Sequence, residues 1–172
     1  MGLPDFYPIA DAARIDNQGM EYWDLMDGGE YTNNGFSPTP YTPWEKEVMG
    51  WTSLTTLEDK AQTVTLKADE ARKIESENSD EYIILHNIQD KDWHSGVAKL
   101  GHGMLIYRVN YGKSSVNMYD HVNDTPGKPG MTVVPADGEL FSSYTANTKE
   151  ERKRYRESHK GDPFPGEKAV TE

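Results

Sequence analysis

The pattern of apolar and polar positions predicts short β-strands in the part of the chain that follows Trp51. Residues 62–67 alternate, which places Val64 and Leu66 on one face, and residues 104–111 alternate in the same way. Residues 82–85 form an apolar run, and residues 131–134 are a further candidate. Short strands separated by Gly, Pro, Asn and Asp are typical of an antiparallel β-sandwich. The residues that we expect in its core are Ile83, Leu85, Leu105, Tyr107 and Val109.

A capping box predicts a short helix over residues 43–49. Thr42 can act as the N-cap and Glu45 follows it at the required spacing, while Pro43 suits the first helical position. Gly50 can end the helix. The residues at i, i+4, i+7 spacing that we expect to pack inward are Trp44, Val48 and Trp51.

A second capping box, Thr148 with Glu151, opens a highly charged segment that predicts a helix over residues 149–159. So many charges favour a solvated helix over a binding site, and Tyr144 and Tyr155 are its candidate anchors. The fold class predicted from these patterns is mainly β (α+β).

Composition excludes several classes of function. The chain has 172 residues and a formal net charge of −11. This charge argues against a nucleic-acid partner, since phosphate binding needs clustered Lys and Arg. There is no Cys, so disulfides, thiol catalysis and cysteine-ligated zinc are impossible. The sequence shows neither a signal peptide nor an apolar run as long as a membrane span.

Two turn-rich segments lie in the first thirty residues. Gly2-Leu3-Pro4-Asp5 combines three turn-forming residue types, and Asp27-Gly28-Gly29 follows an apolar cluster at residues 23–26. The residues alone predict two loops that flank a buried patch.

The two segments also resemble the immune-inhibitor-A-like secreted zinc metallopeptidases, a metzincin-type family. In that family the zinc helix and the turn after it read H-E-x-x-H-x-x-G-L-P-D-L-Y, and a Met-turn of the form W-x-x-M-x-G-G follows. This chain has G-L-P-D-F-Y at 2–7 and W-D-L-M-D-G-G at 23–29, but it contains no H-E-x-x-H. The other segments that carry the resemblance are 33–35, 44–45, 50–51, 103–107, 134–138 and 161–166.

The resemblance implies roles for three residues. Asp5 would be the third zinc ligand, because the Gly of the motif lets the chain turn back to the metal. Met26 would support the metal from below without binding it, and Tyr31 would be a candidate for stabilising the oxyanion. The resemblance also implies that residues 1–51 are the C-terminal remnant of a metzincin-like catalytic domain and that residues 52–172 form the β-sandwich-like domain.

The function that follows is that of a C-terminal fragment of a secreted zinc endopeptidase. Its full-length parent would hydrolyse polypeptides with a zinc-activated water, whereas this chain alone is expected to be inactive and to bind no catalytic zinc tightly. The alternative from a different class is a non-catalytic β-module that binds protein or carbohydrate.

Two further metal hypotheses arise from the residues. His94 and His102 lie in one predicted connection and could meet on a metal, although their spacing is unspecific. Asp120, Asp124 and Asp137 could bind calcium, but no segment resembles an EF-hand loop.

Overall fold

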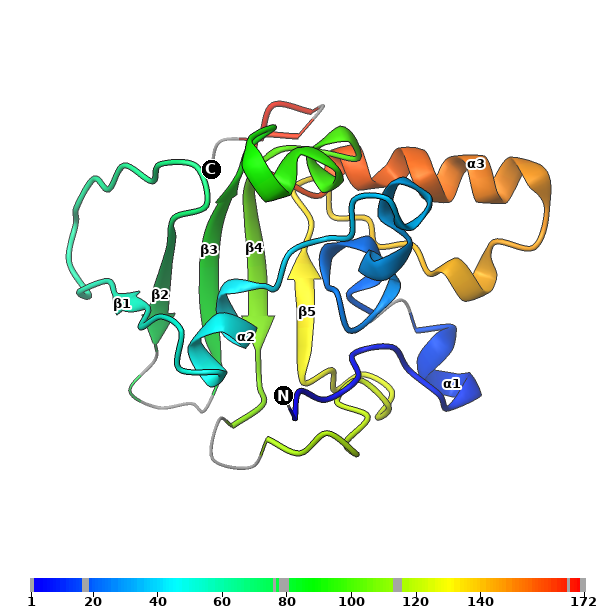
Figure 1. Ribbon diagram of the computed structural model, residues 1–172, viewed down its shortest axis with the longest axis horizontal. Coiled ribbons are helices and arrows are strands. Elements are labelled where there is room, and N and C mark those ends of the chain that lie inside the picture. Colours follow the sequence, from blue (N-terminus) through cyan, green and yellow to red (C-terminus); the bar gives the residue numbers. More distant parts are fainter. Residues whose placement is uncertain are drawn as a thin grey trace.

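The computed structural model describes residues 2–16, 19–75, 77, 81–112, 116–166 and 168–170. In these residues the fold is α+β, built around a single five-stranded sheet with the order β1-β2-β3-β4-β5 (Figure 1). The sheet is mixed, because β1 pairs with β2 in parallel and the other neighbours are antiparallel. The strands are β1 (Thr55–Thr56), β2 (Ala71–Glu75), β3 (Tyr82–Ile88), β4 (Gly103–Val109) and β5 (Met131–Val134).

Three α-helices and several short 3₁₀ segments surround the sheet. Both predicted capping boxes are present, so the two predicted helices are confirmed with their N-caps at Thr42 and Thr148. The α-helices are α1 (Asp11–Arg14), α2 (Pro43–Val48) and α3 (Lys149–Ser158). The 3₁₀ segments are η1 (Glu21–Trp23), η2 (Gly28–Gly35), η3 (Asp92–Ser95), η4 (Val97–Lys99), η6 (Ser143–Thr145) and η7 (His159–Gly161).

The hydrophobic core lies on one face of the sheet, beneath α2 and the N-terminal segment (Figure 1). Phe6 and Trp44 are fully buried there, and their rings meet edge to face at 5.5 Å between centroids. Leu105, Tyr107 and Val109 are buried as predicted. Residues from both predicted domains share this core, and the boundary after Trp51 stays a prediction.

The predicted core positions on β3 are wrong by one residue. Ile84 is buried and pairs with Tyr107, whereas Ile83 points to the other face and is 37% exposed. Leu85 is half-buried on that outer face too. The apolar run at residues 82–85 does not alternate with polar residues, so it does not indicate which face of β3 is buried. The polar His86 also occupies a core position, which the pattern would not predict.

Three other structural predictions need correction. The described residues contain one sheet and no facing second sheet, so the sandwich-like packing is not seen. Residues 62–67 form no strand, and the described strand that follows them and pairs with β3 is β2. Trp51 is 59% exposed, so it does not complete the inward face of α2.

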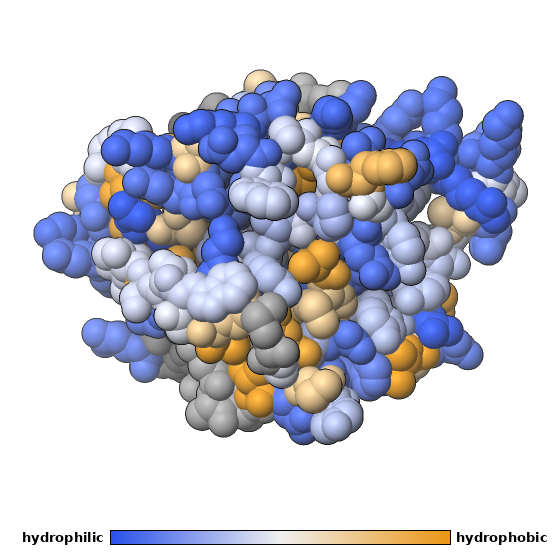
Figure 2. Space-filling view, viewed as in Figure 1, coloured by the Kyte–Doolittle hydropathy of each residue, from blue (hydrophilic) through white to orange (hydrophobic). Residues whose placement is uncertain are grey.

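Polar side chains cover much of the surface, including the region of α3, while apolar residues gather near the lower centre of the view (Figure 2). Among the described residues, no helix combines the length and the apolar character needed to cross a membrane.

Candidate functional site

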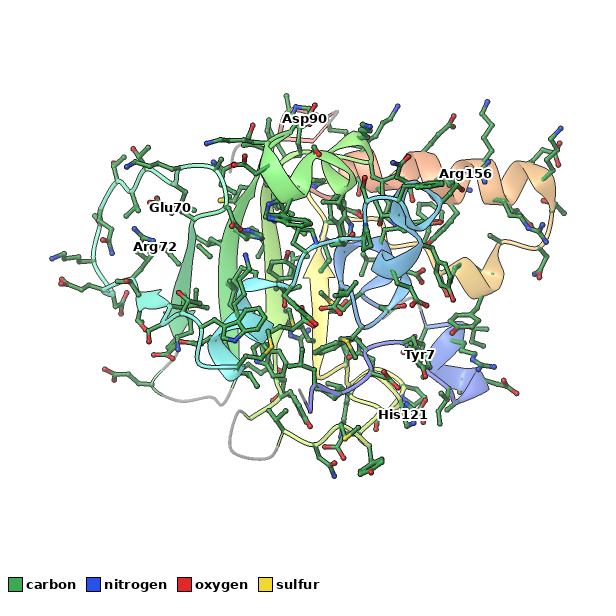
Figure 3. The ribbon with its side chains drawn as sticks, viewed as in Figure 1. Tyr7, Glu70, Arg72, Asp90, His121 and Arg156 are labelled. Carbon is green, nitrogen blue, oxygen red and sulfur yellow. The ribbon has the colours of Figure 1, made fainter. Side chains whose placement is uncertain are left out.

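Asp5 lies in the segment of residues 2–7, called the Asp5 turn here after the predicted turn; the segment starts at Gly2 with a φ of +78° and forms an isolated β-bridge from Asp5 to His121. The Tyr7 hydroxyl donates to the Asp5 carboxylate at 3.0 Å, and the Val122 amide donates to the Asp5 carbonyl at 3.3 Å. The rings of Tyr7 and His121 form a T-shaped pair with their centroids 6.0 Å apart (Figure 3). The hydrogen bond to Asp5, together with its charge, raises the pKa of Tyr7, so the hydroxyl stays a donor at neutral pH. Asp5 is half-buried, and the hydrogen bond from Tyr7 orients its carboxylate.

The segment around Met26 lies directly against the Asp5 turn. The Phe6 amide donates to the Met26 carbonyl at 3.1 Å, and the Met26 amide donates to the Asp24 carboxylate at 2.7 Å. Gly29 closes the turn by donating to the Asp24 carbonyl at 2.8 Å. A Cβ at Gly29 would collide with that carbonyl, so glycine is needed there. The two segments that the sequence singled out are thus neighbours in space.

A cavity of about 520 Å³ opens beside these two segments. Tyr7 and Tyr31 both line it, so the Asp5 turn borders the same cavity as the candidate Tyr31. Tyr31 is 66% exposed, and its hydrogen bond with Glu30 raises its pKa. The lining residues are Tyr7, Glu21, Tyr22, Asp27, Gly28, Glu30, Tyr31, Ser143, Tyr144 and Tyr155.

Carboxyl groups give the cavity wall an acidic character. The Asp27 carboxylate accepts from the amides of Met20 at 2.7 Å and Glu21 at 2.8 Å. Burial, reinforced by the nearby Glu21, raises the pKa of Asp27 to about 7. Tyr155 on α3 donates to the Glu21 carboxylate at 2.6 Å, which ties the far wall of the cavity to η1. A cavity with these groups could hold a polar or basic ligand group.

The other sequence candidates do not assemble as expected. His102 is exposed and lies outside the only three-residue group of candidate metal ligands that the described residues contain. Asp120, Asp124 and Asp137 also lie outside that group. Instead, Asp120 accepts from the Tyr111 hydroxyl and Asp124 from the amides of Ile9 and Ala10.

The group that the described residues do contain consists of Asp69, His86 and His94. One ligand atom from each residue lies within 4.8 Å of the others. The sequence analysis missed it, because Asp69 precedes a strand that was not predicted. Once the pairing of β2 with β3 is known, the closeness of Asp69 and His86 can be inferred, because His86 pairs with Ala71, two residues after Asp69.

Comparisons of this chain with protein-family models, with curated proteins and with solved structures give no match. The resemblance to the zinc metallopeptidases therefore rests on the motifs of the sequence alone.

Proposed function

We propose that this chain is the C-terminal part of an immune-inhibitor-A-like zinc endopeptidase and contributes its third metal ligand, its Met-turn and part of its substrate cleft. The observation that carries the proposal is the hydrogen bond from the Phe6 amide to the Met26 carbonyl. This bond joins residues 2–7, which contain Asp5, to residues 23–29, which contain Met26, and a metal site above a Met-turn would need this proximity.

The residues present fit the zinc that the resemblance implies. A carboxylate oxygen is a normal zinc ligand, and catalytic zinc has three protein ligands plus water. Asp5 supplies one, and an H-E-x-x-H helix ahead of Gly2 would supply the other two and the general base. When bound, the metal would supply a water nucleophile that is active at neutral pH.

The roles of this chain's own residues follow from their positions. Tyr7 orients the Asp5 carboxylate, and Met26 packs beneath the turn. The cavity between Tyr7 and Tyr155 would receive a substrate side chain. The exposed Tyr31 hydroxyl at its wall would be available to stabilise negative charge on the substrate oxygen.

The test starts with the source DNA upstream of Met1, where the proposal expects an H-E-x-x-H coding run in frame. Casein hydrolysis and zinc content are then measured for the given chain, the extended chain and the extended Asp5→Ala variant. We expect hydrolysis only from the extended chain, and one zinc fewer per chain in Asp5→Ala than in the extended parent. Asp59→Ala, at an exposed position, is the matched control and should change neither quantity.

Three results would overturn the proposal. The first is an in-frame stop codon directly upstream of Met1. The second is zinc-dependent hydrolysis by the given chain, and the third is an undiminished zinc content in the extended Asp5→Ala variant.

A further inference from the structure

Three side chains from separate elements converge at the end of the sheet where β2 begins. Asp69 comes from the turn before β2, His86 from β3 and His94 from η3, which crosses that end of the sheet (Figure 1). The Asp69 Oδ1 atom lies 3.1 Å from His86 Nε2 and 3.6 Å from His94 Nε2. The rings of His86 and His94 meet at 5.3 Å between centroids.

The backbone fixes each of the three positions. The Asp69 amide donates to the Asn87 carbonyl at 2.9 Å, and Asp69 has a φ of +63°. This left-handed conformation belongs to a tight turn, and the bond to Asn87 holds that turn beside the strand that carries His86. The His94 amide donates to the Lys91 carbonyl at 3.0 Å. The group is therefore arranged by the fold in advance of any ligand.

The separations suit a small divalent ion. Zinc bonds of about 2.0–2.1 Å with tetrahedral angles place two ligand atoms about 3.3 Å apart. The two distances from Asp69 Oδ1 lie on either side of that value, and the two imidazoles are within 4.8 Å of each other.

The protonation states also suit a metal. Burial lowers the pKa of His86, and burial with the neighbouring His86 lowers the pKa of His94 to about 4. Burial alone would raise the pKa of Asp69, but hydrogen bonds from His86 and Lys46 bring it below its ordinary value. At neutral pH the group is thus two neutral imidazoles and one carboxylate, the forms that ligate metals.

The second ring nitrogen of His86 has a hydrogen-bond partner, the Tyr107 hydroxyl. The His86 Nδ1 atom lies 3.3 Å from that hydroxyl. A metal on Nε2 requires the proton on Nδ1, and the Tyr107 oxygen can accept it there. Such a partner on the second ring nitrogen is a regular feature of metal-bound histidines.

Lys46 is the competing cation. Its ammonium nitrogen lies 3.0 and 3.2 Å from the two Asp69 oxygens. The Asp69 side chain is 47% exposed, and Asp69 and Lys46 both line a cavity of about 260 Å³. Solvent can therefore reach the carboxylate, and the flexible lysine can withdraw when a metal arrives.

We propose that Asp69, His86 and His94 form a binding site for a divalent transition metal of the zinc class, separate from Asp5, with a fourth position open to water. In the metal-free protein the Lys46 ammonium takes the place of the metal charge. Two imidazole nitrogens and one carboxylate oxygen favour zinc over calcium or magnesium, which prefer oxygen ligands. A bound metal would link η3 to the end of the sheet where β2 begins.

The test is calorimetric titration of the given chain with Zn²⁺, supported by the visible spectrum with Co²⁺. We expect one ion per chain and a Co²⁺ spectrum typical of four-coordination. His94→Gln should weaken binding by at least about tenfold, the usual scale for the loss of metal-site interactions. Lys46→Met should strengthen binding, because the competing charge is gone. His102→Gln is the matched control, since His102 is an exposed histidine from the same connection.

The outcomes separate this site from the proposed peptidase centre. Asp5→Ala should leave the titration unchanged, so the second site can stand even if the peptidase proposal fails. His94→Gln changes a residue on a short surface segment, and its thermal melt shows whether the variant is folded. Absence of Zn²⁺ binding, or equal binding by folded His94→Gln, would overturn the proposal and leave the group as a hydrogen-bonded network.

Discussion

At the scale of single residues, the buried carboxyl group of Asp162 is hydrogen-bonded to Trp23, three residues before Met26. The Trp23 indole donates to the Asp162 Oδ2 atom at 2.6 Å, and Asp162 is almost fully buried. Burial raises the pKa of Asp162 to about 7, and the charges of Asp137 and Glu21 act in the same direction. Between its ordinary pKa of 3.8 and about 7, the folded chain binds a proton that the unfolded chain releases. This group therefore makes the protein less stable as the pH rises through that window.

Asp162→Asn tests this linkage. Asparagine keeps an oxygen for the Trp23 indole but cannot ionise, so the variant should gain stability, up to about 4 kcal/mol at pH 8 and only about 1–2 kcal/mol at pH 5. Urea unfolding at the two pH values measures the difference. Some slope should remain, because burial also raises the pKa values of Asp27 and Glu45 to about 7. The exposed variant Asp59→Asn should keep the full slope, and the same slope in Asp162→Asn would contradict the prediction.

At the scale of elements, the apolar spacing of α2 predicts the burial of Trp44 correctly but not that of Trp51, which lies past the end of the helix. Trp44 is fully buried and contacts the rings of Phe6 and Tyr111. Trp51 lies beyond the helix, after Gly50 with its φ of +73°, and its ring and that of Tyr41 meet in a T-shaped arrangement. The i, i+4, i+7 rule fails at Trp51 because the left-handed glycine turns the chain away.

This difference predicts unequal costs of truncation. Trp44→Ala should lower the free energy of unfolding by about 3–5 kcal/mol, as for other buried aromatic residues. Trp51→Ala should cost less than about 1 kcal/mol, because most of its side chain is already in water. Chemical denaturation of both variants against the parent measures the two values. Equal losses would show that Trp51 is part of the core.

The elements also show what the sequence could predict. The two helices were predictable because their capping boxes are local. Strand β2 was not, because its sequence Ala-Arg-Lys-Ile-Glu is mostly polar and its place depends on pairing with β3. Likewise, the order of motifs in the family that the sequence resembles implies the proximity of Asp5 and Met26, whereas the Asp69 group requires the β2–β3 register. Contacts that join distant segments leave no short-range pattern.

At the scale of the whole molecule, residues 121–131 hold the N-terminal segment against the sheet. The Asn123 side chain donates to the Phe6 carbonyl at 3.0 Å and to the Met131 carbonyl at 2.7 Å. Its Oδ1 atom accepts from the Met131 amide at 3.1 Å. One fully buried amide thus joins the Asp5 turn to the start of β5.

Asn123→Ala should therefore loosen the Asp5 turn. The change leaves buried backbone groups without partners, at a cost of about 1–3 kcal/mol for each orphaned group. Hydrogen exchange should accelerate at residues 5–10 more than in β3 and β4. Asn117→Ala is the control, because the Asn117 side chain accepts from its near neighbour Tyr119. Exchange that rises equally throughout the sheet would mean that Asn123 supports global stability and not this attachment.

The attachment of the N-terminal segment also sets an order in time. Phe6 and its partner Asn123 are 117 positions apart, so the ribosome makes the segment long before the residues that hold it. At the usual 5–20 residues per second, the interval is on the order of 10 s. During synthesis the Asp5 turn can be held in place only after the ribosome has made residues 121–131. A prematurely terminated product that lacks residues 121–131 would thus carry the motif without the arrangement that the proposed metal site needs.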